Sequence, residues 1–364
     1  MLEPQASGGS GYDWTAVLLS GWFVGGLFLD GWAHRHVPEL ESFFTPWHAA
    51  FYSGFLAVAG FLMATLVRNY AKGYPWLRAM PPGYELAVLG VLIFLAGGVG
   101  DMIWHEIFGI ESDVEALLSP THLVLATGMT LIFSAPFRAG WRRRIGWNGP
   151  APGWVALLPQ LLSLTFVWCV WSFFTQYAHP LVDTWAAAGY RPPGSRGLAM
   201  LRISLGMAGF LLQTGLMMGM VLCTMRRWAL PFGSFTLVFG LNATFMSFMQ
   251  DQYLLILPAA LAGLVADLLL RWLKPAVERS GSLRLFAFTV PLVYYTLYYV
   301  ALIITRGLEW SVHVWTGSIA LSGVVGLLLT YVLLPPPVPP LQASLWQASP
   351  PVVDLSPAKV RDGG

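Results

Sequence analysis

Two short stretches of this chain carry aspartate and histidine in the same spacing. In the first stretch, Asp30 and His34 are four residues apart, and Thr45 and Pro46 stand just before His48. Residues four apart in a helix lie on one face, and a proline in the first turn is compatible with a helix start. We therefore expect Asp30, His34 and His48 to converge across one helical hairpin.

The second stretch repeats this pattern. Asp101 and His105 are again four residues apart, and Ser119 and Pro120 again stand just before His122. A pattern of Asp-x3-His followed by [Ser/Thr]-Pro-x-His that occurs twice in one chain indicates a shared role for the two hairpins, which we expect to pack side by side.

The donor types in both stretches favour a metal site. Imidazole and carboxylate ligands suit copper, zinc or iron, and no soft sulfur ligand accompanies them. Any one of these residues alone would be typical of a hydrogen-bonded helix end, but six in a repeated pattern favour metal binding.

Five further residues are candidate partners of the ligands, and each has an ordinary alternative as a solvated or ion-paired side chain. Outer partners of this kind orient a ligand histidine. Glu309 and His313, four residues apart, could instead form a second ligand pair or a proton relay. The five are His36, Glu106, Glu111, Glu309 and His313.

The elements that must position these residues are membrane-spanning helices. The chain has 364 residues, of which 56% are hydrophobic and only 10% charged, and its mean hydropathy is +0.62. A soluble domain carries about a quarter charged residues. Apolar runs near twenty residues have the length of a helix that crosses a bilayer. We predict an all-α polytopic membrane protein, and a net charge of +2 gives no indication of nucleic-acid binding.

We predict about ten transmembrane helices in one bundle. A tail at 1–13 precedes a four-helix metal-binding half at 14–138, which is followed by a six-helix half at 139–334 and a disordered, Pro-rich tail at 335–364. The expected spans are 14–33, 46–67, 85–106, 120–138, 152–177, 198–224, 229–249, 252–272, 285–305 and 312–334.

The distribution of Lys and Arg among the loops predicts the orientation. One set of alternate loops is rich in both residues, for example at 138–144 and 271–284, and the opposite set is poor in them. Cytoplasmic loops carry the excess of positive residues. Both termini are therefore expected in the cytoplasm, with the Asp/His stretches on the outward side of the cell membrane. Within one span, Asp267 and Arg271 are four residues apart and predict an intrahelical ion pair.

At the Asp/His stretches the chain resembles the C subunit of the particulate, copper-dependent methane and ammonia monooxygenases. The resemblance covers roughly residues 20–130. It rests on Asp30-Gly31, His34, Phe44-Thr45-Pro46, His48 and Phe51-Tyr52, and on the second set of Asp101, His105, Ser119-Pro120 and His122. By resemblance, each Asp-His-His set would bind copper. Asp101 departs from the family, which has an asparagine there, and residues 150–334 extend beyond the family subunit.

The resemblance implies a copper-binding subunit of a membrane monooxygenase-like complex that oxidises a small apolar substrate with dioxygen. Its partners would be membrane lipid and other subunits of the complex, or further copies of this chain. Three alternatives remain open at this point. They are a membrane protein that binds or delivers copper, a zinc-dependent membrane hydrolase with Glu106 as its base, and an ion-coupled transporter.

Overall fold

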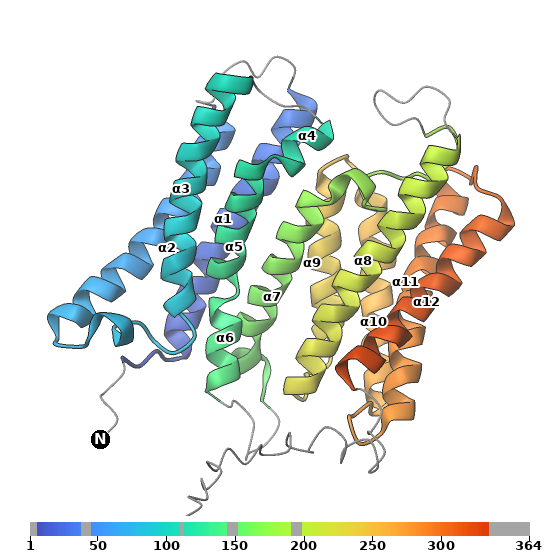
Figure 1. The fold of residues 1–364 in the computed structure, drawn as a ribbon. Coiled ribbons are helices and arrows are strands. Elements are labelled where there is room, and N and C mark those ends of the chain that lie inside the picture. The colour runs from blue at the N-terminus through green and yellow to red at the C-terminus, as the bar shows by residue number, and fades with distance from the viewer. Residues whose placement is uncertain (1–5, 38–44, 110–112, 144–151, 191–198, 335–364) are drawn as a thin grey trace, which may run out of the picture.

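The structure of the protein is a computed structural model, which describes residues 6–37, 45–109, 113–143, 152–190 and 199–334. Nine helices in these ranges are long and apolar enough to cross a membrane. The prediction of an all-helical, multi-pass membrane protein is thereby confirmed (Figure 1). The predicted tail at 335–364 and Glu111 lie outside the described residues.

The N-terminal part of the chain forms two long helical hairpins and a short helix that extends the second. Its helices are α1 (Ser10–His36), α2 (Pro46–Ala71), η1 (Trp76–Arg78), α3 (Glu85–Phe108), α4 (Asp113–Leu118), α5 (Pro120–Phe133) and α6 (Ala135–Arg142). The helix expected from residue 14 begins earlier, at Ser10. The proline-started helices begin as predicted, at Pro46 and Pro120.

The C-terminal part continues with further antiparallel helices. They are α7 (Trp154–Phe174), η2 (Gln176–Ala178), α8 (Ala199–Arg227), α9 (Ser234–Phe248), η3 (Tyr253–Leu255), α10 (Ile256–Leu273), α11 (Ser280–Thr305) and α12 (Val312–Leu333).

Two of the ten predicted spans differ from a single long helix. The span expected at 229–249 is α9, which has 15 residues and falls short of the roughly 20 that cross a hydrocarbon core. The span expected at 120–138 is divided at Ser134 into α5 and α6, because Pro136 lies in the first turn of α6 and cannot donate a backbone hydrogen bond there.

The predicted ion pair within α10 is wrong. The carboxylate of Asp267 accepts hydrogen bonds from the backbone N–H groups of Phe235 and Thr236, each at 3.0 Å, and from the Thr236 hydroxyl at 2.7 Å. Arg271 instead lies over the Phe232 ring. The first turn of α9 has unpaired N–H groups and a positive dipole end, and these attract the carboxylate more strongly than a partly solvated arginine does.

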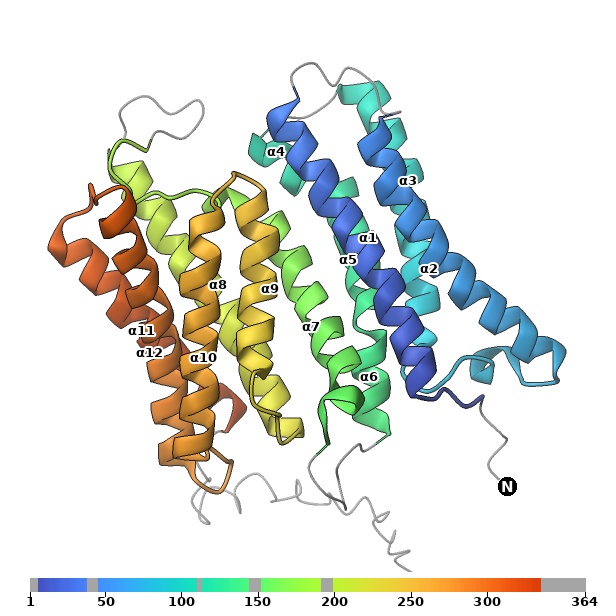
Figure 2. The ribbon, with the colours of Figure 1, turned by 180° about the vertical axis from the view of Figure 1, so that it is seen from behind.

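The helices are arranged around α7, which contacts α1 on one side and α9 on the other. Figures 1 and 2 show α1–α6 on one side of α7 and α8–α12 on the other. The α1–α2 hairpin lies beside the α3–α5 hairpin, because α2 contacts α3 and α1 contacts α5. The expected side-by-side packing of the two hairpins is thus present.

Glycines bring the two helices of each hairpin into backbone contact. A β-carbon on Gly26 of α1 would lie 2.6 Å from the Phe51 Cα of α2, and one on Gly54 would lie 2.6 Å from the Phe23 Cα. In the second hairpin, a β-carbon on Gly90 would lie 2.8 Å from the Gly128 carbonyl oxygen. Small residues of this kind allow close helix packing in membranes, and here they fix the spacing of the helices that carry the Asp/His sets.

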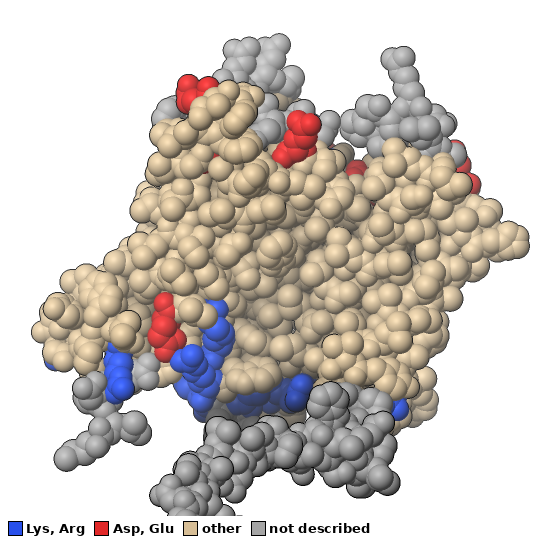
Figure 3. Space-filling model, viewed as in Figure 1, with Lys and Arg blue, Asp and Glu red and all other residues tan. Residues whose placement is uncertain are grey.

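Charged side chains are separated along the bundle. Figure 3 shows the lysines and arginines gathered at the end of the molecule that is lowest in the picture, with acidic side chains mainly at the opposite end. The Asp/His stretches lie at the C-terminal ends of α1 and α3 and the N-terminal ends of α2 and α5, which is the end away from the basic cluster (Figure 1).

Candidate metal centres

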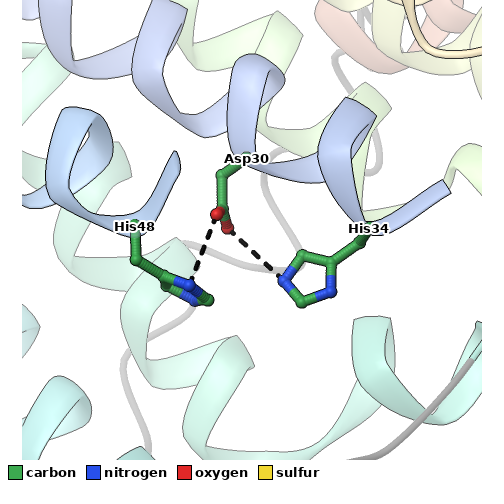
Figure 4. Close-up of side chains that lie close together, drawn as sticks. All are labelled: Asp30, His34 and His48. Carbon is green, nitrogen blue, oxygen red and sulfur yellow. Dashed lines mark ion pairs between the residues drawn. The ribbon is translucent and has the colours of Figure 1, made fainter. Parts of the chain in front are cut away.

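The first Asp/His set converges between α1 and α2. Asp30 and His34 project from successive turns at the end of α1, and His48 lies in the first turn of α2. The His34 Nε2 lies 3.8 Å from Asp30 Oδ2, and the His48 Nδ1 lies 3.5 Å from Asp30 Oδ1 (Figure 4). One ligand atom from each of the three residues lies within 4.8 Å of the others, so a single ion placed among them could be reached by all three.

The carboxylate of Asp30 is incompletely satisfied. Its Oδ1 is buried, and no hydrogen-bond donor among the described residues reaches it. The His48 Nδ1 at 3.5 Å is beyond good hydrogen-bond geometry. A buried charged oxygen without a partner is costly, and a cation held between Asp30 and the two imidazoles would supply what it lacks. The donor set therefore fits a metal ion.

Thr45 holds the ring of His48. Its hydroxyl oxygen accepts from the His48 backbone N–H at 3.1 Å, which caps α2, and lies 3.0 Å from the His48 Nδ1. The nitrogen that faces Asp30 is thus the one that Thr45 also contacts. His34 is the more open of the two histidines, with 43% of its side chain exposed.

The second Asp/His set converges between α3 and α5. The Nε2 atoms of His105 and His122 lie 3.4 Å and 3.2 Å from the two oxygens of Asp101, whose side chain is only 5% exposed. Asp101 also accepts a 2.8 Å hydrogen bond from the Thr121 hydroxyl. These three residues again place one ligand atom each within 4.8 Å of the others.

Outer contacts of the second set leave both Nε2 atoms facing the carboxylate. His105 Nδ1 lies 3.3 Å from the Gly109 carbonyl oxygen, and His122 Nδ1 lies 2.9 Å from Ser119 Oγ. The Ser119 hydroxyl lies 3.3 Å from that of Thr121. These contacts hold both rings in the orientation that points Nε2 at Asp101, as the outer contacts of a metal-binding imidazole do.

Tyr52 lies between the two sets and was not expected at this place. It follows His48 by one turn of α2, and its ring is nearly parallel to that imidazole, with centroids 6.3 Å apart. Its hydroxyl lies against Gly98 of α3, where a β-carbon would come within 3.6 Å. The carboxylates of Asp30 and Asp101 both act electrostatically on Tyr52. The two sets are therefore neighbours, with an aromatic side chain between them.

The remaining candidate residues are not part of either set. His36 points away, with its Nε2 3.0 Å from Asp251 Oδ2 and its Nδ1 2.9 Å from the Trp32 carbonyl oxygen. Glu309 pairs with Arg202 of α8 at 2.8 Å. His313 is exposed in the first turn of α12, and Glu106 is exposed beside His105 on α3.

Sequence reasoning did not assign a role to the hydroxyls of Thr45, Ser119 and Thr121. A signal was present, since Ser or Thr just before the first helical residue is the usual helix cap. What the sequence does not reveal is that the capping oxygen also contacts the histidine ring three residues later.

No protein family, curated protein or solved structure that we compared matches this chain. The interpretation of the site therefore rests on its own geometry and on the residues that form it.

Proposed function

We propose that this protein is a copper-binding integral membrane subunit of a copper membrane monooxygenase-like complex, with one metal site in each of the two hairpins. The observation that carries the proposal is the repeated Asp-His-His set, in which three ligand atoms from two helices lie within 4.8 Å of one another. The Oδ1 of Asp30 also supports the proposal, because this buried carboxylate oxygen has no hydrogen-bond donor and a bound cation would stabilise it.

The choice of metal follows from the ligands. Two imidazoles and one carboxylate suit a divalent ion of intermediate softness, and among first-row ions of this kind copper binds most tightly. Zinc and iron are the competitors for the same set. The resemblance of the two stretches to the copper monooxygenase C subunit favours copper.

The location of the sets fits chemistry on an apolar substrate. The excess of basic residues at the opposite end favours a cytoplasmic location for that end by the positive-inside rule, and both sets would then lie at the outward side of the cell membrane. A bound copper ion supplies reactivity toward dioxygen. The chain itself would hold the ion at the lipid boundary, where an apolar substrate concentrates, and partner subunits would complete the complex.

Each residue has a definite part in this proposal. Asp30 and Asp101 supply the negative charge, and four histidines, His34, His48, His105 and His122, supply neutral nitrogen ligands. Ser119 and Thr121 orient His122 and the Asp101 carboxylate, whereas Thr45 contacts the His48 nitrogen that faces Asp30.

The test is metal analysis of the purified full-length protein after metal removal and separate repletion with copper, zinc and iron. We expect stoichiometric copper in the unaltered protein. His34→Ala and His48→Ala should lose the ion of the first hairpin, and His105→Ala and His122→Ala the ion of the second. His313→Ala is the matched control, because it removes an exposed histidine from the first turn of a helix away from both sets.

Three results would contradict the proposal. One is an unaltered protein that holds no stoichiometric metal, and another is unchanged metal content in His34→Ala and His48→Ala. The third is loss of metal from His313→Ala alone, which would move the site to α12. Thermal unfolding and gel filtration on every variant separate loss of a ligand from loss of the fold.

A second function, delivery of copper to a partner protein, is favoured by one observation. The His34 side chain is 43% exposed, so a ligand exchange with an incoming protein could begin there. Transfer of bound copper to an acceptor chelator with a rate that depends on acceptor concentration would support delivery. A rate independent of the acceptor would support a resident ion.

A further inference from the structure

A cavity lies inside the C-terminal part of the bundle, away from both Asp/His sets. It is lined by residues of α7, α8, α9, α11 and the segment that follows η2. The volume open to the centre of a water-sized molecule is about 10 Å³, near the lower limit of ~10–15 Å³ that holds one water. Its lining residues are Trp168, His179, Pro180, Leu181, Gln213, Met217, Asn242, Tyr294 and Tyr295.

Two of the lining residues each have a buried polar atom without a partner. Asn242 is 1% exposed and Trp168 is 3% exposed. Within the described part of the chain, the Asn242 Oδ1 receives no hydrogen bond and the Trp168 Nε1–H finds no acceptor. An acceptor and a donor at one cavity are complementary to a molecule that can both donate and accept.

The amide of Asn242 is held in place from the other side. Its Nδ2 donates to Ser172 Oγ at 3.3 Å, and that hydroxyl donates to Gln213 Oε1 at 3.3 Å. Gln213 Nε2 then donates to Thr175 at 2.8 Å. This chain of hydrogen bonds crosses α7, α8 and α9 inside an apolar bundle, and it fixes which end of the Asn242 amide remains open.

His179 is neutral and offers a second donor. Its Nδ1 accepts a 3.1 Å hydrogen bond from the Leu181 backbone N–H, which leaves the proton on Nε2. Burial lowers the pKa of His179 from 6.5 to about 3, so the ring stays uncharged near neutral pH. The lining residues include no other titratable group that is charged at that pH, and a neutral ligand is therefore the one that fits.

A neighbouring cavity of the same size provides a contrast. It is lined mainly by apolar residues, with Leu161, Val221 and Phe235 among them, and Trp168 lines both cavities. Its two hydroxyls, those of Thr165 and Thr224, already donate to carbonyl oxygens of their own helices. Apolar cavities of this kind stay dry. The two cavities therefore differ in the polar atoms that remain without a partner, and not in volume.

We propose that the cavity beside Asn242, Trp168 and His179 is a binding site for one water molecule, held inside the membrane bundle by the Asn242 carbonyl oxygen and by the donors of Trp168 and His179. The site is independent of metal binding. The water would connect α7, α9 and the segment after η2 through hydrogen bonds that these elements do not make directly.

Hydroxyl-radical footprinting of the full-length protein in nanodiscs tests this proposal, because radicals generated from a bound water modify the side chains beside it. We expect several-fold greater oxidation of Met217 than of Met129, although both are almost fully buried. Tyr295 should likewise exceed Phe235, which lines the apolar cavity and is equally buried at 2%. In ¹⁸O-labelled water the added oxygen should carry the label.

Two variants of Asn242 have different expected effects on the oxidation of Met217. Asn242→Leu replaces the acceptor with hydrocarbon and should reduce the oxidation of Met217 to that of Met129. Asn242→Ser enlarges the polar space and should maintain or increase it. Oxidation of Met217 no greater than that of Met129 in the unaltered protein would overturn the proposal. So would unchanged oxidation in a folded Asn242→Leu, and Trp168→Phe serves the same purpose if that variant fails to fold.

Discussion

The two hairpins carry the same Asp-x3-His and [Ser/Thr]-Pro-x-His elements but differ in what surrounds the carboxylate. Asp101 receives a hydrogen bond from Thr121, and two imidazoles face it through Nε2. Asp30 has one buried oxygen without a donor, and the His48 nitrogen that faces it is also in contact with Thr45. The two sets therefore share their sequence pattern but differ in the hydrogen bonds that their carboxylates receive.

The difference has opposite consequences for the metal-free and the metal-bound protein. An unsatisfied buried polar group costs about 1–3 kcal/mol, so the first hairpin has more to gain from an ion. The second hairpin has less to rearrange, because its imidazoles are already held in the orientation that binding needs. We expect the smaller rearrangement to outweigh this gain, so that the second site binds more tightly and is also stabilised more at a given free-metal concentration.

The largest expected difference between the hairpins is in metal affinity after loss of the capping hydroxyl. Ser119→Ala removes the atom that holds His122 by its Nδ1, and the second site should bind metal about 10–100-fold more weakly. Thr45→Ala removes a competitor for the His48 nitrogen that faces Asp30, and the first site should keep its affinity or gain some. Competition with a chelator of known affinity measures both.

Loss of the helix cap, which is common to Ser119→Ala and Thr45→Ala, provides an internal control. Each variant loses a helix cap and should lose about 1 kcal/mol of stability. A common fall in stability with a divergent change in affinity is the expected result. Equal weakening of the two sites would mean that the two hydroxyls act only as caps.

An intermediate effect is expected when each carboxylate is replaced by an amide. Asp30→Asn removes a charge that lacks a donor, and it should raise the free energy of unfolding of the metal-free protein by about 1 kcal/mol. Asp101→Asn turns a charge-assisted hydrogen bond into a neutral one, and it should lower that free energy by about 1 kcal/mol. Thermal unfolding of the metal-free variants in detergent measures the sign. Shifts of the same sign in both variants would remove the proposed difference between the carboxylates.

The smallest expected difference between the hairpins concerns Thr121, which has no counterpart in the first hairpin. Trp47 stands at the equivalent place between proline and histidine. Thr121→Val keeps the shape of the side chain but leaves Asp101 without its donor, and should cost the metal-free protein about 1 kcal/mol. Thr127→Val on the same helix is the matched control, because its hydroxyl bonds only to Leu123 of that helix. Equal losses in both variants would assign the effect to hydroxyl removal in general.

The sequence was sufficient to predict which residues meet. Two ligands four apart on one helix and a third in a proline-started first turn are local features, and the helices begin at Pro46 and Pro120 as those features require. Convergence of the three then needs only that consecutive helices pack as a hairpin, which short connections favour.

The sequence could not predict which atoms face one another. Whether Nδ1 or Nε2 of a histidine faces the carboxylate depends on ring rotation and on hydroxyls whose sequence pattern predicts only the starts of helices. Asp267 illustrates the same limit, because its local spacing to Arg271 predicted an ion pair while a helix end distant in sequence provided the partner. Tyr52 came to lie between the sites through contact of α2 with α3, which no local pattern contains.

The paired glycines bear on how such a protein can change over time. Since backbone contact at Gly26, Gly54, Gly90 and Gly128 sets the separation of the helices, the ligands do not depend on the connections above them for their spacing. Those connections differ in length between the two hairpins, the second being the longer. A methyl group added at one of the four glycines is therefore a larger change to the site than several residues added to a loop, provided that Thr45, Gly109 and Ser119 keep their contacts with the histidines.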